Sequence, residues 1–379
     1  MSAADLPTPD DWDLEGRTVL VRVDFNVPVI AGPGGPEVAD DFRIRTALPL
    51  FEQLQARGAR VVAATHFGRP RGTVDARYDV APIRQRLAEL RPGVELLENL
   101  RFDPGEEAND PAFGASLVAG RDYYVNEAFG ASHRAHASVM VPPTLVPSAA
   151  GPNLRREVGF LLDALAAPAR PFVAIVGGAK VADKLGVVRT LVERADTVIV
   201  GGAMAYTFEA ALGRGIGASL VDVAHLEDCR ELLASGKVVI PLDTRGLAVG
   251  ARVGDGGGPD EVVDFGADIP DGYEGFDVGS RSLARFAEVL DGARTVFWNG
   301  PLGFFEDPRF AAGTEAIARL VAASAALSIV GGGDSAAALA RFGLSEQIDF
   351  VSSGGGASLE LLEFGDLPGL RALREGRRA

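Results

Sequence analysis

Short apolar segments alternate with longer amphipathic segments along almost the whole chain, and this alternation restricts the fold more than any other feature. Short apolar runs that end in polar or glycine-rich turns are typical of buried parallel strands. The longer segments between them are typical of helices that cover a sheet. We therefore predict an α/β fold. The expected strands are 18–23, 60–65, 94–97 and 122–125 in the first half, and 172–176, 197–200, 237–241, 295–298, 327–330 and 349–352 in the second half.

Two further segments lie outside this alternation. The sequence "PNLRREVGFLLDALAAPARP" connects the two sets of strands, and it has the pattern of one amphipathic helix that begins after Pro152 and ends near Pro168. We interpret it as the connector between two domains. Residues 244–280 are rich in glycine, proline and acidic residues, so we expect a loop there.

Composition narrows the classes of partner. The chain has 379 residues and a formal net charge of −15, so nucleic acids and anionic membrane surfaces are poor partners. The first residues, "MSAADLPTPDDWDL", do not resemble a signal peptide, and no apolar run reaches the roughly 18 residues of a membrane span. The one cysteine, Cys229, lies in a helical pattern and fits a buried bystander better than a nucleophile. We expect a cytoplasmic protein that binds neither nucleic acid nor membrane.

Basic and polar residues follow the predicted strands of the first half. Ligands of open α/β sheets bind at the carboxyl ends of the strands, so these residues should converge. Because side chains alternate along a strand, Arg22, Asp24 and Asn26 share one face, although Arg22 could instead support the site from beneath. The other candidates are Arg43, His66, Arg69, Arg101 and Arg134.

The residue types of this group point to the class of ligand. Arginine binds phosphate and carboxylate oxygens, and aspartate or asparagine binds a hydroxyl. An ion pair would explain any one arginine, but four strand ends that each supply arginine or histidine favour a binding site. The sequence therefore predicts a small, polyanionic, hydroxylated ligand.

Glycines follow the predicted strands of the second half, in "IVGGAK", "IVGGAM", "FWNGP", "IVGGGDS" and "VSSGGGAS". Glycine after a strand lets backbone N–H groups approach phosphate oxygens, and the next helix N-terminus favours negative charge. Each glycine pair is weak by itself, because such turns often contain glycine. The chain has no GxxxxGK[ST] motif and no GxGxxG after a strand, which disfavours a dinucleotide dehydrogenase.

Lysine occurs at only three positions, and two of them, Lys180 and Lys184, lie in "GGAKVADK". If the helix begins at Ala179, both ammonium groups lie on one helix face beside the glycines. A solvated helix face would explain either lysine alone. In a chain that otherwise uses arginine, the pair favours a functional role.

Together these motifs resemble the phosphoglycerate kinase family. The resemblance spans almost the full length and runs in order through "RVDFNVP", "DDFRI", "THFGRP", "LLENLRF", "NEAFGASHRAHAS", "GGAKVADK", "ADTVIVGGAMAYTF", "VFWNGPLGFFE", "IVGGGDS" and "SSGGGASLELLE". It implies two Rossmann-like domains with parallel sheets, joined by an interdomain helix at about 153–167, with a cleft between them. The implied domains are 1–152 plus about 362–379, and 153–361.

The resemblance also implies ligands for each domain. The N-terminal domain would bind 3-phosphoglycerate or 1,3-bisphosphoglycerate through Asp24, Asn26, Arg43, His66, Arg69, Arg101 and Arg134. The C-terminal domain would bind ADP or ATP with Mg²⁺, the metal lying near Asp334. The implied nucleotide contacts are Lys184, Gly275, Glu306, Gly332, Gly333, Asp334 and Ser335.

The chain departs from the family pattern at several positions. Phe364 and Asp366 stand where glycine and lysine are common, and Ser280 and Arg281 stand where a proline–lysine pair is usual. Residues 242–262 match poorly. These departures concern nucleotide preference and domain closure rather than the chemistry.

The implied reaction is reversible phosphoryl transfer from 1,3-bisphosphoglycerate to ADP, giving ATP and 3-phosphoglycerate, as in glycolysis and gluconeogenesis. It needs in-line positioning and neutralisation of charge rather than a general base. We expect these from Mg²⁺, Arg43, Lys180 and backbone N–H groups at Gly332 and Gly355. A monomer is expected. The alternatives are a catalytically silent phosphometabolite-binding protein of the same fold and a nucleotide-dependent transferase with another acceptor.

Overall fold

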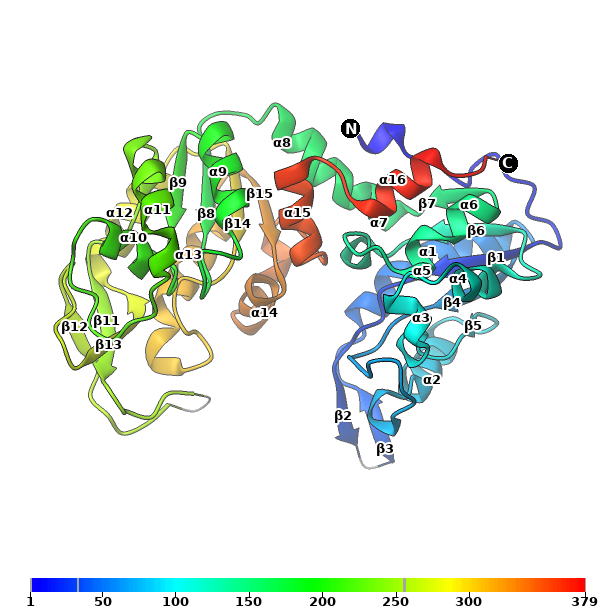
Figure 1. Ribbon diagram of the computed structural model, residues 1–379, viewed down its shortest axis with the longest axis horizontal. Coiled ribbons are helices and arrows are strands. Elements are labelled where there is room, and N and C mark those ends of the chain that lie inside the picture. Colours follow the sequence, from blue (N-terminus) through cyan, green and yellow to red (C-terminus); the bar gives the residue numbers. More distant parts are fainter. Residues whose placement is uncertain (1, 33, 255–256, 379) are drawn as a thin grey trace. The chain divides into compact units, whose positions relative to one another are not determined.

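Two parallel sheets organise the chain, one in each of two units (Figure 1). The computed structural model describes residues 2–32, 34–254 and 257–378. Unit 1 runs to Asp163 and resumes at Phe364, and unit 2 is Ala164–Glu363. The α/β fold predicted from the alternation of strand and helix patterns is confirmed. No helix in the described ranges has both the length and the apolar character needed to cross a membrane.

The sheet of unit 1 has five parallel strands in the order β5-β4-β1-β6-β7. The strands are β1 (Thr18–Arg22), β4 (Arg60–Ala64), β5 (Glu95–Leu96), β6 (Tyr123–Asn126) and β7 (Ser148–Ala150). The first four lie where the apolar runs predict them. The three-residue β7 is too short to leave a pattern. A two-stranded antiparallel hairpin, β2 (Val29–Gly32) with β3 (Gly35–Val38), was also not predicted.

The helices of unit 1 pack apolar stripes on this sheet. In α1 (Phe42–Ala56), buried apolar residues recur at helical spacing and join a core cluster with Val19 and Val21 of β1. The other helices are α2 (Ala81–Leu90), α3 (Pro104–Glu107), α4 (Pro111–Val118), α5 (Ala137–Met140), α6 (Pro142–Leu145) and α16 (Pro368–Glu375). The C-terminal α16 packs on α5, α6 and β7, so the end of the chain returns to unit 1 (Figure 1).

The chain passes from unit 1 to unit 2 inside a helical segment. This segment consists of α7 (Pro152–Val158), the π-helical turn η5 (Gly159–Asp163) and α8 (Ala164–Ala166). Helix is therefore present where the sequence predicts it, but its middle turn is π-helical. Both carboxylate oxygens of Glu127 accept the Asn153 N–H, at 3.2 and 3.1 Å, and so cap the start of α7.

The sheet of unit 2 has six parallel strands in the order β10-β9-β8-β14-β15-β16. The strands are β8 (Phe172–Val176), β9 (Thr197–Val200), β10 (Val238–Val239), β14 (Thr295–Asn299), β15 (Leu327–Gly331) and β16 (Phe350–Val351). All six lie within or next to the predicted strands. The strand order reverses between β8 and β14, which is where open α/β sheets form ligand crevices.

The helices of unit 2 are α9 (Leu185–Arg194), α10 (Ala205–Ala211), α11 (Leu226–Ala234), α12 (Ser280–Leu290), α13 (Ala312–Ala323), α14 (Gly333–Arg341) and α15 (Gly356–Phe364). Cys229 lies on α11, and burial raises the pKa of its thiol to about 12. A buried thiol that stays protonated fits the role of a bystander.

The prediction of a loop over 244–280 is wrong where three strands form, and it holds for most of the segments between these strands. Residues 255 and 256, within the predicted loop, lie outside the described ranges. A three-stranded antiparallel sheet occupies this segment in the order β12-β11-β13. Its strands are β11 (Thr244–Ala248), β12 (Val263–Phe265) and β13 (Tyr273–Val278). Gly246 serves this sheet. A Cβ at Gly246 would lie 2.1 Å from the Glu274 carbonyl oxygen, at a point where the pairing register shifts.

An aspartate distant in sequence caps α12. Asp243 Oδ2 accepts the Arg281 N–H at 2.9 Å, and Oδ1 accepts the Ser282 N–H at 2.8 Å and the Ser282 hydroxyl. These bonds satisfy two of the backbone donors that a helix start leaves unpaired, and the negative charge suits the positive end of the helix dipole. Asp243 therefore ties the chain before β11 to the start of α12.

Replacing Asp243 with alanine should lower the free energy of unfolding of unit 2 by about 2 kcal/mol, because a buried cap and its hydroxyl contact are lost. The two tryptophans are Trp12 in unit 1 and Trp298 in unit 2. A Trp12→Phe background therefore leaves Trp298 as the fluorescent reporter of unit 2. Urea denaturation of this background, with and without Asp243→Ala, measures the difference.

The matched control for this measurement is Asp291→Ala at the exposed C-terminal end of the same helix. Its carboxylate lies at the negative end of the helix dipole, so its removal should not lower stability. If Asp243→Ala stays within about 0.5 kcal/mol of its background, the capping role is contradicted.

Candidate functional site

The carboxyl edge of the unit 1 sheet carries the charged residues that the sequence singles out. We call Asp24, Asn26, Arg43, His66, Arg69, Arg101 and Arg134 the basic cluster. Asp24 and His66 follow the neighbouring parallel strands β1 and β4. The strand order of unit 1 changes direction at β1, so the cluster lies where α/β sheets bind ligands.

Asp24 is the centre of direct contacts in this cluster. Arg43, on α1, donates from Nη1 to Asp24 Oδ2 at 3.0 Å, and His66 Nδ1 lies 4.0 Å from Asp24 Oδ1. Burial opposes ionisation of Asp24, but His66, Arg43 and Arg22 outweigh it and keep the pKa of its carboxyl below the usual value. Asp24 is therefore an ionised acceptor, able to hold a ligand hydroxyl.

The loop after β4 joins further members of the cluster. Asn26 Oδ1 accepts the Gly68 N–H at 3.0 Å, and Arg101 donates from Nη1 to the Gly68 carbonyl at 2.7 Å. Arg69 follows this glycine and is exposed. Burial, and next the charge of Arg134, lower the pKa of Arg101, so these two guanidinium groups lie near each other. Two neighbouring guanidinium groups suit an anionic ligand that relieves their repulsion.

Three buried residues lie behind the basic cluster. Arg22, Glu106 and Ser138 are each at most 1% exposed, and hydrogen bonds connect them to one another and to His66. The sequence names Arg22 but not Glu106 or Ser138. No local pattern could find these two, because Ser138 lies 116 residues from Arg22 in the chain.

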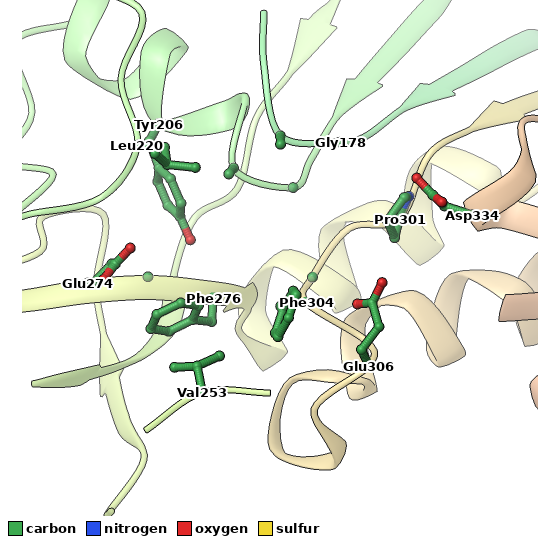
Figure 2. A pocket seen from close by; sticks show the side chains of 15 residues that line it. Gly178, Tyr206, Leu220, Val253, Glu274, Phe276, Pro301, Phe304, Glu306 and Asp334 are labelled. Carbon is green, nitrogen blue, oxygen red and sulfur yellow. The ribbon is translucent and has the colours of Figure 1, made fainter. Parts of the chain in front are cut away.

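Unit 2 has a cavity of about 420 Å³ at its strand-order reversal. The loops after β8, β9 and β14 contribute Gly178, Gly202 and Pro301 to its lining, and the start of α14 after β15 contributes Asp334. In Figure 2 the two ends of this pocket differ in character. Tyr206, Leu220, Val253 and Phe276 lie toward one end together with the carboxylate of Glu274, whereas Pro301, Glu306 and Asp334 lie toward the other. Such a pocket can hold a flat apolar ring at one end and a charged group with a metal ion at the other.

The condition that a helix begins at Ala179 is not met, because α9 begins at Leu185 and Lys184 is its N-cap residue. Residues 179–184 form a bend and a turn, so the two lysines are not neighbours on a helix face. Lys184 instead folds back and donates from Nζ to the Gly177 carbonyl and, at 2.8 Å, to Asn299 Oδ1. Burial lowers the pKa of Lys184 to about 8, against the attraction of Asp334 and Asp183.

Asn299 is a candidate that sequence reasoning missed, although it lies in the quoted motif "FWNGP". It ends the central strand β14 and is 2% exposed. Its Oδ1 accepts from Lys184, while its Nδ2 is buried and has no hydrogen-bond partner among the described residues. A buried donor without a partner, at the carboxyl edge of a sheet, can serve an anionic ligand.

Glycine is required at two places near this edge. Gly332 has φ 96°, and a Cβ there would lie 3.0 Å from Asn299 Nδ2. Gly275 lines the pocket, and a Cβ there would lie 2.3 Å from the Tyr206 hydroxyl. Both positions therefore keep space that a side chain would fill.

Gly332, Gly333, Asp334 and Ser335 form the start of α14, and Asp334 lines the pocket. Gly332 is the N-cap residue, and Gly333 and Asp334 are exposed in the first turn. Ser335 is buried, and its hydroxyl accepts the Gly300 N–H at 2.6 Å, so it holds the loop after β14. Exposed first-turn N–H groups and the helix dipole favour an anion here.

The residues present fit Mg²⁺ that arrives with a ligand. In the described ranges no group of three or more histidine, cysteine, aspartate or glutamate side chains could hold a metal by itself. Mg²⁺ is commonly held by one or two carboxylates together with substrate phosphates. The exposed Asp334 beside the anion-favouring helix start can provide such a carboxylate.

The remaining predicted residues have different positions. Gly275 and Glu306 line the pocket together with Asp334, whereas Lys180 and Gly355 are not among the described residues that line it. Lys180 is exposed in the bend that follows Gly178 and Ala179, both lining residues. Gly355 precedes α15 and has φ 49°.

Comparison with known proteins gives one consistent result. The model of the family "Phosphoglycerate kinase" matches residues 9–95 and 89–364. The phosphoglycerate kinase of Rubrobacter xylanophilus is 47% identical over 96% of this chain and 97% of that protein. The one from Moorella thermoacetica is also 47% identical, over 97% and 99%. The structure of phosphoglycerate kinase from Coxiella burnetii matches with a TM-score of 0.85 at 33% identity, over 97% of this chain and 98% of that one.

Lys184 should lose its positive charge near pH 8. Because burial favours the neutral amine, Lys184 should be protonated below about pH 8 and neutral above it. The affinity of the unit 2 site for an anion should therefore fall as the pH rises through 8. Protein labelled with ¹³C at the lysine Cε gives a signal for each of three lysines, and Lys184→Arg identifies the relevant one. A Lys184 signal that titrates near the ordinary lysine value of about 10.4 would contradict this expectation.

Proposed function

The chain belongs to the phosphoglycerate kinase family, and we propose that unit 1 binds the three-carbon substrate while unit 2 binds the nucleotide. Its activity is that of a phosphoglycerate kinase, a kinase of glycolysis. The observation that supports this division of roles most directly is the basic cluster. Its cations gather on one sheet edge of a chain whose net charge is −15.

The basic cluster suits 3-phosphoglycerate or 1,3-bisphosphoglycerate. Arg69, Arg101 and Arg134 are the proposed contacts for phosphate and carboxylate oxygens, because guanidinium groups bind both with paired N–H donors. Asp24 and Asn26 would hold the hydroxyl, since each has oxygen acceptors at this edge. His66 would donate one more hydrogen bond.

The pocket of unit 2 suits ADP or ATP. The end lined by Tyr206 and Leu220 would hold the base, packed against Gly275 (Figure 2). Glu306 would contact the nucleotide at the other end of the pocket. The phosphates would extend toward the start of α14, where Gly332, Gly333 and Ser335 lie. Lys184 and Nδ2 of Asn299, which has no partner among the described residues, would donate to the phosphate oxygens.

The proposed mechanism depends on position and charge. The attacking oxygen belongs to a phosphate or a carboxylate, which is ionised at neutral pH, so no side chain has to remove a proton. Arg43 in unit 1 and Lys180 in unit 2 would neutralise charge that spreads over the phosphoryl oxygens, together with N–H groups near Gly332 and Gly355. Mg²⁺ held at Asp334 would supply further charge neutralisation at the phosphates.

We also propose a cytoplasmic location and a monomeric state. Glycolytic activity supports the first, and the second stays a prediction from the sequence.

Purified protein should form ADP from ATP when 3-phosphoglycerate and Mg²⁺ are both present. Glucose or pyruvate in place of 3-phosphoglycerate should give little turnover, and EDTA should abolish it. A coupled assay measures each case. Binding of 3-phosphoglycerate without turnover would indicate a silent binding protein, and turnover with another acceptor only would indicate a different transferase. Turnover that persists in metal-free buffer would count against the role of Asp334.

Lys180→Arg separates a catalytic lysine from a solvated one. Arginine keeps the charge but is larger and planar, so kcat should fall at least about tenfold if Lys180 is a compact charge on the phosphoryl group. Lys180→Ala or Arg43→Ala should lower kcat roughly 100-fold with little change in KM, because a transition-state contact is lost. Arg101→Ala should instead raise the KM for 3-phosphoglycerate.

The matched control is Lys237→Arg, because Lys237 donates to the Val192 carbonyl and is not among the described residues that line the pocket. Its kcat should stay near that of the unchanged protein. Circular dichroism checks that each variant folds. A near-normal kcat in Lys180→Arg would overturn the catalytic role of Lys180.

A further inference from the structure

A buried chain of hydrogen bonds lies under the basic cluster and ends on His66. Arg22 donates from Nε to Ser138 Oγ at 2.9 Å and contacts His66 Nδ1 through Nη2 at 3.2 Å. Ser138 in turn contacts Glu106 Oε1 at 2.7 Å. We call Glu106, Ser138 and Arg22 the buried relay.

The burial of the buried relay is unusual for charged groups. Glu106 is 0% exposed and Arg22 is 1% exposed. Burying a charge costs free energy unless it is paired and hydrogen-bonded, so these two groups need each other. They are linked through the hydroxyl of Ser138. An apolar core would be cheaper to build than this arrangement, which points to a role beyond packing.

The chemistry of each group assigns the protons along the buried relay. Glu106 is ionised because burial, which opposes the charge, is outweighed by His136, Arg22 and Ser138, so the pKa of its carboxyl is about 2. The single Ser138 proton therefore goes to Glu106, and the Ser138 oxygen accepts from Arg22. Arginine has N–H donors and no acceptor, so Nη2 can only donate to His66 Nδ1.

His66 consequently lies between two competing partners. Arg22 offers a donor to Nδ1 at 3.2 Å, whereas Asp24 offers an acceptor 4.0 Å from the same atom. The Arg22 contact favours the tautomer with its proton on Nε2, and an Asp24 contact would favour a proton on Nδ1. The position of Arg22 decides between them.

We propose that Glu106 is a positioning residue for the three-carbon substrate: through Ser138 it holds Arg22 against His66 Nδ1, and so keeps the Nε2–H of His66 as the donor offered to the substrate. This inference rests on the proposed function of unit 1. With the opposite tautomer, Nε2 would present a lone pair to an anionic ligand, which is repulsive.

Burial, together with three neighbouring arginines, keeps His66 neutral. Burial lowers the pKa of His66 to about 3, and Arg22, Arg101 and Arg134 act in the same direction while Asp24 opposes them. The tautomer, rather than the charge, is therefore the property of His66 that the neighbours can change near neutral pH.

The tautomer of His66 can be measured directly in the ligand-free protein. The chain has four histidines, so long-range ¹H–¹⁵N spectra of the imidazoles contain few signals, and His66→Gln identifies those of His66. At pH 7, Nδ1 should have the shift of an unprotonated nitrogen and Nε2 that of a protonated one. A proton on Nδ1, or on both nitrogens, overturns the proposal without any variant of the buried relay.

Ser138→Ala tests whether the buried relay sets this tautomer. Without the hydroxyl between them, the Arg22 guanidinium and the Glu106 carboxylate can pair directly, which draws Nη2 away from His66 and leaves Nδ1 to Asp24. The Nδ1–H tautomer should then become detectable, and the KM for 3-phosphoglycerate should rise about fivefold, as for one lost hydrogen bond, with little change in the KM for ATP.

Ser148→Ala is the matched control. Ser148 is a buried serine of the same unit, 2% exposed, whose hydroxyl donates to the Val146 carbonyl. It should leave the His66 shifts and the KM unchanged. Glu106→Gln removes the charge itself and should shift the tautomer as Ser138→Ala does. If Glu106→Gln fails to fold, the spectra of Ser138→Ala and of the unchanged protein still test the proposal.

The outcomes separate this inference from the proposed function. Unchanged His66 shifts in a folded Ser138→Ala overturn the buried relay, even if the protein is an active kinase. If the tautomer shifts as expected but 3-phosphoglycerate gives neither binding nor turnover, the hydrogen-bond relay is real and the assigned substrate is wrong. A raised KM with unchanged shifts would show that Ser138 acts in some other way, and it would overturn the proposal.

Discussion

Parallel backbone pairing is the constraint on which both sites depend. Because β1 pairs in parallel with β4 and β6, the residues after these strands must lie at one edge of the sheet. The pairing of β8, β14 and β15 has the same effect in unit 2, where Asn299 is in register with Val176 and Gly331. Strand direction therefore determines where the basic cluster and the pocket lie, and the loops after the strands supply the residues that make them up.

The two edges use this position in different ways. Unit 1 places long cationic side chains there, and it holds them with partners such as Asp24 and the Gly68 carbonyl. Unit 2 instead lacks a side chain at Gly332 after β15 and, beside the pocket, at Gly275 on β13, and a Cβ at either position would meet a neighbouring side chain. In the proposed function, one edge would recognise anions through side chains, and the other would use backbone N–H groups together with Lys180 and Lys184.

Burial holds the protonation states that such sites need. Lys184 is desolvated until its pKa falls to about 8, and His66 is kept neutral although Asp24 lies nearby. Glu106 shows the opposite outcome, because its hydrogen bonds and positive neighbours outweigh desolvation. Whether a buried group is charged thus depends on the partners that surround it, and those partners come from several segments.

The sequence by itself determined the class of fold and the ten predicted strands, because a strand that is buried on both faces is a continuous apolar run. It also showed which residue types follow these strands, and parallel strand direction places those residues at one edge of each sheet. Local sequence patterns did not predict the antiparallel strand that contains Gly246, because glycine is more common in loops. They also did not show that Lys184 ends a turn instead of lying within a helix. Only the tertiary structure decided which groups touch. Glu106, Ser138 and Arg22 are separated by 32 and 116 residues along the chain, and Lys184 and Asn299 by 115. Contacts at such separations depend on the packing of whole elements, which no local pattern contains.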